Sequence, residues 1–384
     1  MLAEQSGDIP YIYFFMLFDH SKYTCLIKKA IFVLLLYPSL LVGCTTAEAP
    51  AIAEKINLPA EEAYFTNPIA DGADPWVVRN DSVYYFCSAG SGAIYVSKSG
   101  KLTEPGEKVA VWETPDSGWN KSNVWAPELH RFGGKWYIYY AAARKPGGPF
   151  LYQRSGVLES QGDDPFGPYL DKGMLYTGDS IQYASAAPKW AIDLTPMPLN
   201  GQLYAVWSGW EADAETDRTK QHLYMARMLN PWTISSNRVR ISSPEEPWET
   251  GGELDLNEGP QVLKHKGKVF IIYSTRESWL KEYRLGQLTL SDTLLNPMEP
   301  AHWEKAGPVF QGTDKVLGVG HCSFTTSPDG TEHWVLYHSK KTEAPGWDRN
   351  IRAQEFTWTA DGFPDFGAPV PVGVPLPLPS GQEE

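Results

Sequence analysis

The 384-residue sequence predicts an all-β fold, and more specifically a five-bladed β-propeller. The chain is rich in aromatic residues, with 15 Trp, 20 Tyr and 15 Phe, and it has few long amphipathic helical patterns. A unit that consists of a turn signal, an aromatic or β-branched strand and a second strand recurs five times. The units follow one another at roughly 55–65 residues, somewhat longer than the usual repeat of a propeller blade.

The five units follow in order along the chain. Their turns contain Asn-Gly, Asp-Gly or Gly-Gly in several cases, and these residues accept the positive φ that tight hairpins require. The predicted pairs of strands are 82–87 with 93–97, 133–141 with 150–154, 200–208 with 221–226, 266–274 with 283–289, and 329–338 with 351–358.

The first 44 residues have the features of an export leader. Lys28 and Lys29 precede a short apolar run at 30–36, which is short for a membrane-spanning helix, and Leu41 to Cys44 resembles a bacterial lipobox. A lipid on Cys44 would be the only membrane contact and would place the protein at the bacterial cell envelope, facing the periplasm or the cell surface. A plain signal peptide, and hence a secreted protein, or an N-terminal anchor is the alternative. The leader is long, which Met16 as the true start would explain.

Residues 45–63 are rich in Ala, Glu and Pro and predict a tether, so that the propeller takes residues 64–384. The sequence after Pro364 is rich in proline and shows no strand pattern. We therefore expect a single propeller domain with no appended carbohydrate-binding domain.

Composition excludes some classes of partner. The net charge of −13 argues against a nucleic-acid partner, which requires a basic surface, and is compatible with a neutral ligand such as a sugar. Outside the leader the only cysteines are Cys87 and Cys322. They could form a disulfide in an oxidising compartment, but two distant cysteines give no framework, and buried free thiols are favoured.

Ionisable residues precede each hairpin unit. Glu258 lies between Asn257 and the Gly259-Pro260 pair, and because proline suits the first residue of a strand, we expect Glu258 at a strand mouth. A propeller gathers its innermost strands around one axis, so residues at the strand mouths converge on one central funnel. Crowded acids shift the pKa values of one another and indicate a functional site. The five residues are Asp74, Glu128, Asp193, Glu258 and His321.

At these positions the sequence resembles glycoside hydrolase family 43. The resemblance runs from about residue 63 to 375 and most closely suggests the exo-acting α-L-arabinofuranosidases, through the stretches 318–330 and 352–364. The blade motifs that carry it are Asn67-Pro68-Ile69 with Asp74-Pro75, Trp125-Ala126-Pro127-Glu128, Ile192-Asp193, Glu258-Gly259-Pro260 and Gly320-His321.

The resemblance implies hydrolysis of a glycosidic bond with inversion. Asp74 would be the general base that activates water, Glu258 the general acid that protonates the leaving oxygen, and Asp193 a third acid that holds Glu258 and raises its pKa. Inversion predicts carboxyl groups roughly 6.5–9.5 Å apart. The structural alternatives are a turn acid for Asp74, an ion pair with Lys189 for Asp193, and a turn cap for Glu258.

Two further polar positions have open roles. Glu128 either binds substrate or fixes its own blade by hydrogen bonds to the backbone. His321 is either a buried core histidine or, as the resemblance implies, a ligand of a metal ion or an ordered water at the axis. Calcium is the ion that the family suggests, and it would be structural, because the chemistry itself requires no cofactor. One histidine supplies too few ligands, so water would have to complete the shell.

Aromatic and basic residues near the mouths could contact a sugar, since an aromatic face packs on the apolar face of a sugar ring. Trp76, Trp125 and Trp210 are the candidates, with the core between blades as their alternative. Arg352 could reach sugar hydroxyls or form a salt bridge to a neighbouring blade. Trp279 and Lys281, after the fourth hairpin, could wall the pocket.

The expected function is removal of terminal α-L-arabinofuranosyl residues from arabinan or other arabinose-containing plant polysaccharides and oligosaccharides. A β-xylosidase or an endo-arabinanase of the same family is the first alternative, because pocket depth decides between exo and endo action. A lipoprotein that binds glycans without chemistry is the second. The presence of all three acids favours the enzyme.

Overall fold

The computed structural model describes residues 63–383 except 184, 214–215 and 217. The leader, its Cys44 and nearly all of the tether lie outside the described residues. Within the described part, the regular structure is β-strand apart from one 3₁₀ turn, η1 (Pro300–His302). No helix among these residues is long and apolar enough to cross a membrane.

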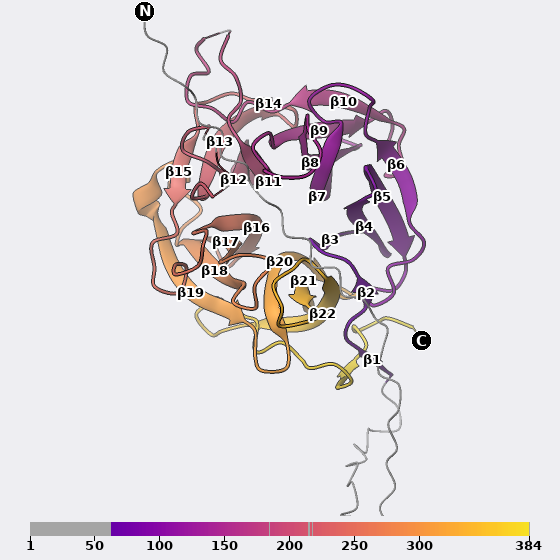
Figure 1. Cartoon of the computed structure of the whole chain (residues 1–384). Coiled ribbons are helices and arrows are strands. Elements are labelled where there is room, and N and C mark those ends of the chain that lie inside the picture. The colour runs from indigo at the N-terminus through magenta and orange to yellow at the C-terminus, as the bar shows by residue number, and fades with distance from the viewer. Residues whose placement is uncertain (1–62, 184, 214–215, 217, 384) are drawn as a thin grey trace, which may run out of the picture. The chain divides into compact units, whose positions relative to one another are not determined.

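Five antiparallel sheets surround a common centre and form the predicted five-bladed β-propeller (Figure 1). Blade 1 contains β3 (Trp76–Asn80), β4 (Val83–Gly90), β5 (Ala93–Ser99) and β6 (Val109–Glu113). Blade 2 contains β7 (Ser122–Phe132), β8 (Lys135–Ala143), β9 (Arg154–Ser160) and β10 (Tyr169–Met174). Blade 3 contains β11 (Ala191–Leu199), β12 (Gln202–Gly209), β13 (His222–Asn230), β14 (Thr233–Ile234) and β15 (Val239–Ser242).

The last two blades close the ring. Blade 4 contains β16 (Asn257–His265), β17 (Lys268–Thr275), β18 (Arg284–Leu290) and β19 (Trp303–Gln311). Blade 5 contains β20 (Leu317–Thr326), β21 (His333–Lys340) and β22 (Arg349–Trp358), and its fourth strand is β2 (Ala70–Asp71) from the start of the propeller. Two short pairs complete the set: β23 (Pro364–Asp365) on β22, and β1 (Tyr64–Thr66) with β24 (Pro375–Pro377).

The first strand of each blade is the innermost one. β3, β7, β11, β16 and β20 contact one another in that order, and β20 returns to β3, so these five strands line the axis (Figure 1). Because each blade starts at the centre, all five inner strands begin at the same end of the propeller. The residues at their starts therefore meet at one mouth.

Packing between neighbouring blades makes the core. Between blades 3 and 4, for example, Met197 and Val206 lie in one buried cluster with Val269 and Leu288. Consecutive apolar residues of one strand pack on opposite faces of the sheet: in β17, Val269 and Ile271 belong to one buried cluster and Phe270 and Ile272 to another, so the sheet is buried on both faces. Cys87 and Cys322 are buried free thiols, as favoured from the sequence.

The predicted hairpins correspond to the second and third strands of the blades. The second strand of unit 2 is the exception: 150–153 is a loop, and β9 begins at Arg154. The aromatic residues there suggested a strand, but they belong to the rim of the mouth. The proline-rich tail also forms a strand, β24, because an edge strand tolerates prolines that cannot donate to a ladder.

Candidate active site

The inner strands of blades 2 to 5 each contain a β-bulge near their start. The register with the second strand shifts across 125–128, 192–195, 258–261 and 320–323, where the inner strand advances by three residues and its partner by two. One residue in each bulge adopts a positive φ, and Asp74 adopts it just before β3. The residues with this conformation are Asp74 (49°), Ala126 (43°), Asp193 (55°), Gly259 (54°) and His321 (42°).

This conformation is costly for residues other than glycine, and its recurrence at the mouth is a feature of the site. Asp74, Asp193 and His321 occupy equivalent places in blades 1, 3 and 5 and meet near the axis. In blade 4 the residue with positive φ is Gly259, and Glu258 lies one residue before it. In blade 2 that residue is Ala126, and Glu128 lies two residues after it. The five predicted residues therefore lie at three different depths along the axis, and proline at 127 and 260 fits the bulges because it need not donate there.

Asp74 is held in its ionised form. Its Oδ1 lies 3.2 Å from Arg349 Nη1, 3.4 Å from His321 Nδ1 and 3.2 Å from His338 Nδ1. Burial alone would raise the pKa of Asp74, but Arg349, His321 and His338 outweigh it and hold the pKa well below its ordinary value. A quarter of the side chain, 25%, remains exposed, so water reaches this carboxylate.

Glu258 and Asp193 behave in the opposite way. Both side chains are buried, and burial, strengthened by the charge of Asp74 and, for Asp193, that of Glu258, raises the pKa of each carboxyl above its ordinary value. Asp193 Oδ2 accepts a hydrogen bond of 2.9 Å from the backbone N–H of Gly259, next to Glu258. The Tyr283 hydroxyl donates to Glu258 Oε1 at 2.8 Å. The pair therefore holds protons at a pH where an exposed carboxyl would have lost them.

Tyr283 and His338 connect the two sides of this cluster. Their rings stack with centroids 5.3 Å apart, and His338 Nδ1 lies 3.2 Å from the backbone nitrogen of Asp74. Gly320 makes room for the pair, because a Cβ at this position would lie 2.2 Å from the Tyr283 ring. Neither Tyr283 nor His338 was predicted from the sequence.

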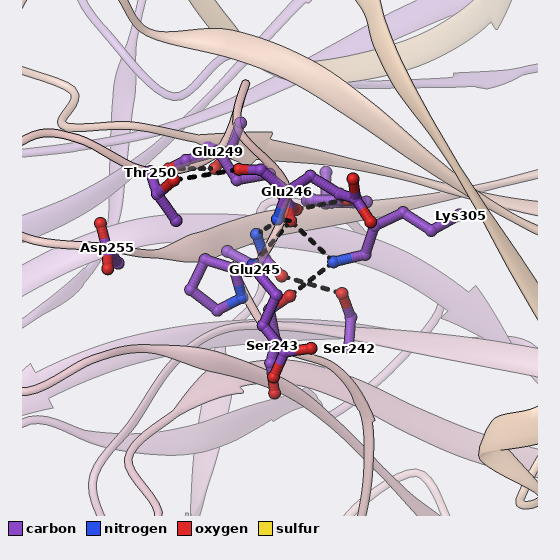
Figure 2. Close-up of polar contacts among 12 residues, drawn as sticks. Ser242, Ser243, Glu245, Glu246, Glu249, Thr250, Asp255 and Lys305 are labelled. Atoms are coloured by element: carbon purple, nitrogen blue, oxygen red, sulfur yellow. Dashed lines mark hydrogen bonds and ion pairs between the residues drawn. The ribbon is translucent and has the colours of Figure 1, made fainter.

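A second buried carboxylate, Glu249, anchors the segment that leads to Glu258 (Figure 2). Its Oε1 accepts hydrogen bonds from Asn257 Nδ2 at 2.9 Å and from the Tyr273 hydroxyl at 2.7 Å. Its Oε2 accepts from Lys305 Nζ at 2.8 Å, and the ammonium also reaches the carbonyl of Ser243 (Figure 2). The outer strand β19 is thereby tied to Asn257, the residue before Glu258.

Glu128 lies deeper, where the inner strands of three blades meet. Its carboxyl contacts the amide of Gln261, the hydroxyl of Thr195 and His130 Nε2, the last at 2.9 Å. Burial raises the pKa of Glu128 to about 8 and lowers the pKa of His130 to about 3. The side chain is 2% exposed, and this placement favours the structural alternative over contact with a substrate.

The surroundings of His321 do not fit a calcium site made by the protein. Calcium takes six to eight oxygen ligands, whereas the side chains in direct contact with the His321 ring include one carboxylate, Asp74, and a second imidazole, His338. Among the described residues between 63 and 383, no group of three or more His, Cys, Asp or Glu side chains could hold a metal ion.

The predicted aromatic residues differ in burial. Trp210 is 1% exposed and stacks on Trp190 with centroids 4.4 Å apart, as its core alternative requires. Trp76 is half-buried and donates from Nε1 to the carbonyl of Leu129 at 2.8 Å. Trp125 is also half-buried and meets Phe150 edge-to-face at 4.8 Å, so Trp125 is the one that adjoins the rim of the mouth.

Basic residues near the mouth differ in the groups that they contact. Arg352 is buried and donates to Ser339 Oγ and to the carbonyl of Val370, so its guanidinium is engaged within the protein. Arg349, which the sequence analysis did not select, is the arginine beside Asp74. Lys189 forms its ion pair with Asp179, so the ion pair between Lys189 and Asp193 that was the structural alternative for Asp193 is not formed.

Comparisons with known proteins agree with this geometry. An extracellular exo-α-(1→5)-L-arabinofuranosidase of Streptomyces avermitilis is 36% identical over 81% of this chain, which spans 64% of that relative's length. An enzyme of the same description from Streptomyces chartreusis is 35% identical over 80% of this chain and 91% of its own length. The crystal structure of an α-L-arabinofuranosidase from Lactobacillus brevis superposes with a TM-score of 0.72 at 29% identity, covering 81% of this chain and 98% of the other.

The family model described as glycosyl hydrolases family 43 matches residues 65–364, the greater part of the propeller. The match includes Asp74, Asp193, Glu258 and their neighbours. The resemblance seen in the five strand mouths is confirmed, and the chain belongs to glycosyl hydrolase family 43.

Proposed function

We propose that this protein is an inverting α-L-arabinofuranosidase that removes single arabinose units from the non-reducing ends of arabinan and arabino-oligosaccharides. One observation carries the proposal: at one mouth, Asp74 lies against Arg349 and two histidines, which lower its pKa, whereas Glu258 is buried against Tyr283 and has a raised pKa. Inverting hydrolysis needs this combination, an ionised base and a protonated acid. The names of the Streptomyces relatives support arabinofuranose as the sugar.

The reaction uses only carboxyl groups and water. Asp74 takes a proton from the water that attacks the anomeric carbon, and Glu258 gives its proton to the glycosidic oxygen as that bond breaks. The products are arabinose of inverted configuration and a shortened chain with a new hydroxyl. Asp74 leaves the step protonated and Glu258 ionised, and exchange with solvent restores both.

The other residues prepare the two groups. Arg349, His321 and His338 keep Asp74 ionised before it accepts the proton. Asp193 fixes the backbone beside Glu258, and burial together with the negative charge of Asp74 makes loss of the proton from Glu258 harder in the absence of substrate. Because the hydroxyl of Tyr283 donates a hydrogen bond to Glu258 Oε1, we assign the proton that is transferred to the substrate to Oε2.

The test uses the purified full-length protein with α-1,5-arabinotriose and β-1,4-xylotriose. We expect arabinose and arabinobiose as the first products from the former and no release of xylose from the latter, which tests the β-xylosidase alternative. Proton NMR of the first turnovers should show arabinose with the anomeric configuration opposite to that of the substrate. Retention would contradict the roles of Asp74 and Glu258, and absence of any turnover would favour a glycan-binding protein.

We also propose that residues 1–44 export the chain and that Cys44 receives the lipid. The Lys28-Lys29 pair, the apolar run at 30–36 and the Leu41-to-Cys44 motif support this. In a bacterial host, radiolabelled palmitate should be incorporated into the wild type and not into Cys44→Ala, and the variant should move from the membrane fraction to the soluble one. Membrane association that survives the substitution would contradict the lipid anchor.

A further inference from the structure

A row of aromatic side chains lies along one side of the mouth. The inner strands start at the mouth, so the second strands end there, and the loops between second and third strands form its rim. These loops are 144–153 in blade 2, 210–221 in blade 3, 276–283 in blade 4 and 341–348 in blade 5, whereas blade 1 has only a two-residue turn at 91–92. The rim is therefore lowest at blade 1, and the loops of the two neighbouring blades, 2 and 5, meet above it.

The contact between these loops is aromatic. Phe150 from blade 2 meets Trp347 from blade 5 edge-to-face, with ring centroids 6.5 Å apart. Trp347 in turn meets Trp279 from blade 4 at 5.6 Å, and the backbone N–H of Gly346 donates to the carbonyl of Trp279 at 2.9 Å. Trp125 adjoins Phe150, so the row runs through the four residues Trp125, Phe150, Trp347 and Trp279.

Two members of this row are tied to the acids. Trp125 occupies in blade 2 the place that Glu258 holds in blade 4, one residue before the positive φ. Trp347 precedes by two residues Arg349, whose guanidinium contacts Asp74. The row therefore begins beside the buried carboxyl groups and continues outward from them.

Trp347 is the exposed member of the row. It is 56% exposed, an unusual state for the largest apolar side chain. Its neighbours Phe150 and Trp279 hold it in place edge-on, which leaves ring surface open to solvent. An indole that is fixed by its neighbours and has an exposed ring face can pack against the apolar face of a sugar ring.

We propose that Trp347, supported by Phe150 and Trp279, forms the subsite for the sugar on the leaving-group side of the scissile bond. This rests on the proposed function. The terminal arabinose must place its anomeric carbon between Asp74 and Glu258, which are largely buried, so the rest of the chain has to leave toward solvent. Trp347, the exposed member of the row, stands two residues before Arg349, which contacts Asp74, and so borders this exit.

The experiment measures binding in the full-length protein with Glu258→Gln, which prevents turnover. Arabinose, which reaches only the terminal-sugar subsite, and α-1,5-arabinotriose, which also reaches the proposed one, are titrated by calorimetry. Adding Trp347→Ala should weaken arabinotriose binding by about tenfold and leave arabinose binding unchanged, whereas Trp347→Phe should retain most of the affinity. Leu229→Ala, also at an exposed apolar position (75%), is the matched control and should change neither.

Three outcomes would overturn the assignment. Unchanged arabinotriose affinity in Trp347→Ala would show that the indole does not touch the substrate. An equal loss for arabinose and arabinotriose would place the row in the terminal-sugar subsite instead. Failure of the Glu258→Gln parent to bind either sugar would overturn the proposed function as well, and this result is distinguishable because it does not depend on Trp347.

Discussion

Two carboxyl groups at the mouth of the propeller differ in protonation because their neighbours differ. Asp74 has an arginine and two imidazoles around one oxygen, while Glu258 has a phenol and other acids nearby. Both are crowded by protein, so burial opposes ionisation in each case. Only Asp74 has positive charge close enough to reverse that tendency, and this difference supports the opposite roles proposed for the two side chains.

The pH profile should report these two states. Burial raises the pKa of Glu258 to about 7, so kcat/KM should fall as the pH rises past neutrality and the acid loses its proton. Asp74, with its lowered pKa, should keep the enzyme active well into the acidic range. The acidic limb belongs to the base and the alkaline limb to the acid.

Tyr283→Phe should move the alkaline limb upward. The hydroxyl stabilises the ionised form of Glu258, so its removal raises the pKa of Glu258 further. The measurement is kcat/KM on arabinotriose from pH 4 to pH 10 for both proteins. An alkaline limb that stays in place or moves downward would contradict the assignment of Glu258 as the acid.

At the scale of single elements, the bulges at the starts of the inner strands in blades 2 to 5 are what aim side chains at the axis. The bulge was not predictable, because register depends on pairing with a partner strand. The segment before β16 is positioned by Glu249 and Lys305, which bring charge into the packed interior of blade 4. Glu249 is 0% exposed and accepts bonds from five groups, so its charge depends on these partners.

Lys305→Met should destabilise the protein sharply. It leaves the Glu249 carboxylate buried without its cation, which costs about 3–5 kcal/mol, and the melting temperature should fall by roughly 10 °C. Adding Glu249→Gln to Lys305→Met should recover part of that loss, because no buried charge then remains. Differential scanning calorimetry of the wild type, both single variants and the double variant checks this, and purely additive losses would show that the two groups are not coupled.

At the scale of the whole molecule, the ring is closed by the start of the propeller. β2 pairs with β22 of blade 5, and Asn67, just before it, exchanges two hydrogen bonds with the backbone of Ala353, at 2.8 and 2.9 Å. These residues are 286 positions apart, so the contact links blade 1 to blade 5. A propeller without this closure would have a free edge on its last blade.

Asn67→Ala should therefore lower thermal stability. It leaves a buried backbone N–H and carbonyl of Ala353 without partners, at a cost of about 2–4 kcal/mol. Asn80→Ala is the matched control, since its amide lies at the surface and contacts only Asp81, and it should leave the melting temperature nearly unchanged. Equal melting temperatures for the two variants would contradict a role of Asn67 in closure.

The sequence predicted the propeller and the convergence of its acids because hairpin signals are local and recur in order. It did not predict which residues surround each acid. Arg349 and Arg352 lie three positions apart in one strand, so they face opposite sides of the sheet, and only the register of β21 and β22 shows which one reaches Asp74. Tyr283 could have been selected from the sequence, because it is the last residue of the loop between β17 and β18, on the mouth side of the blade.

The central claim is that Glu258 gives the proton to the leaving oxygen while Asp74 activates water. The most direct test compares kcat/KM of Glu258→Gln and Asp74→Asn on arabinotriose and on 4-nitrophenyl α-L-arabinofuranoside, whose leaving group needs little protonation. Glu258→Gln should lose about a thousandfold or more on arabinotriose and far less on the nitrophenyl glycoside, whereas Asp74→Asn should lose similar factors on both. Equal losses on the two substrates for Glu258→Gln would contradict its role as the acid.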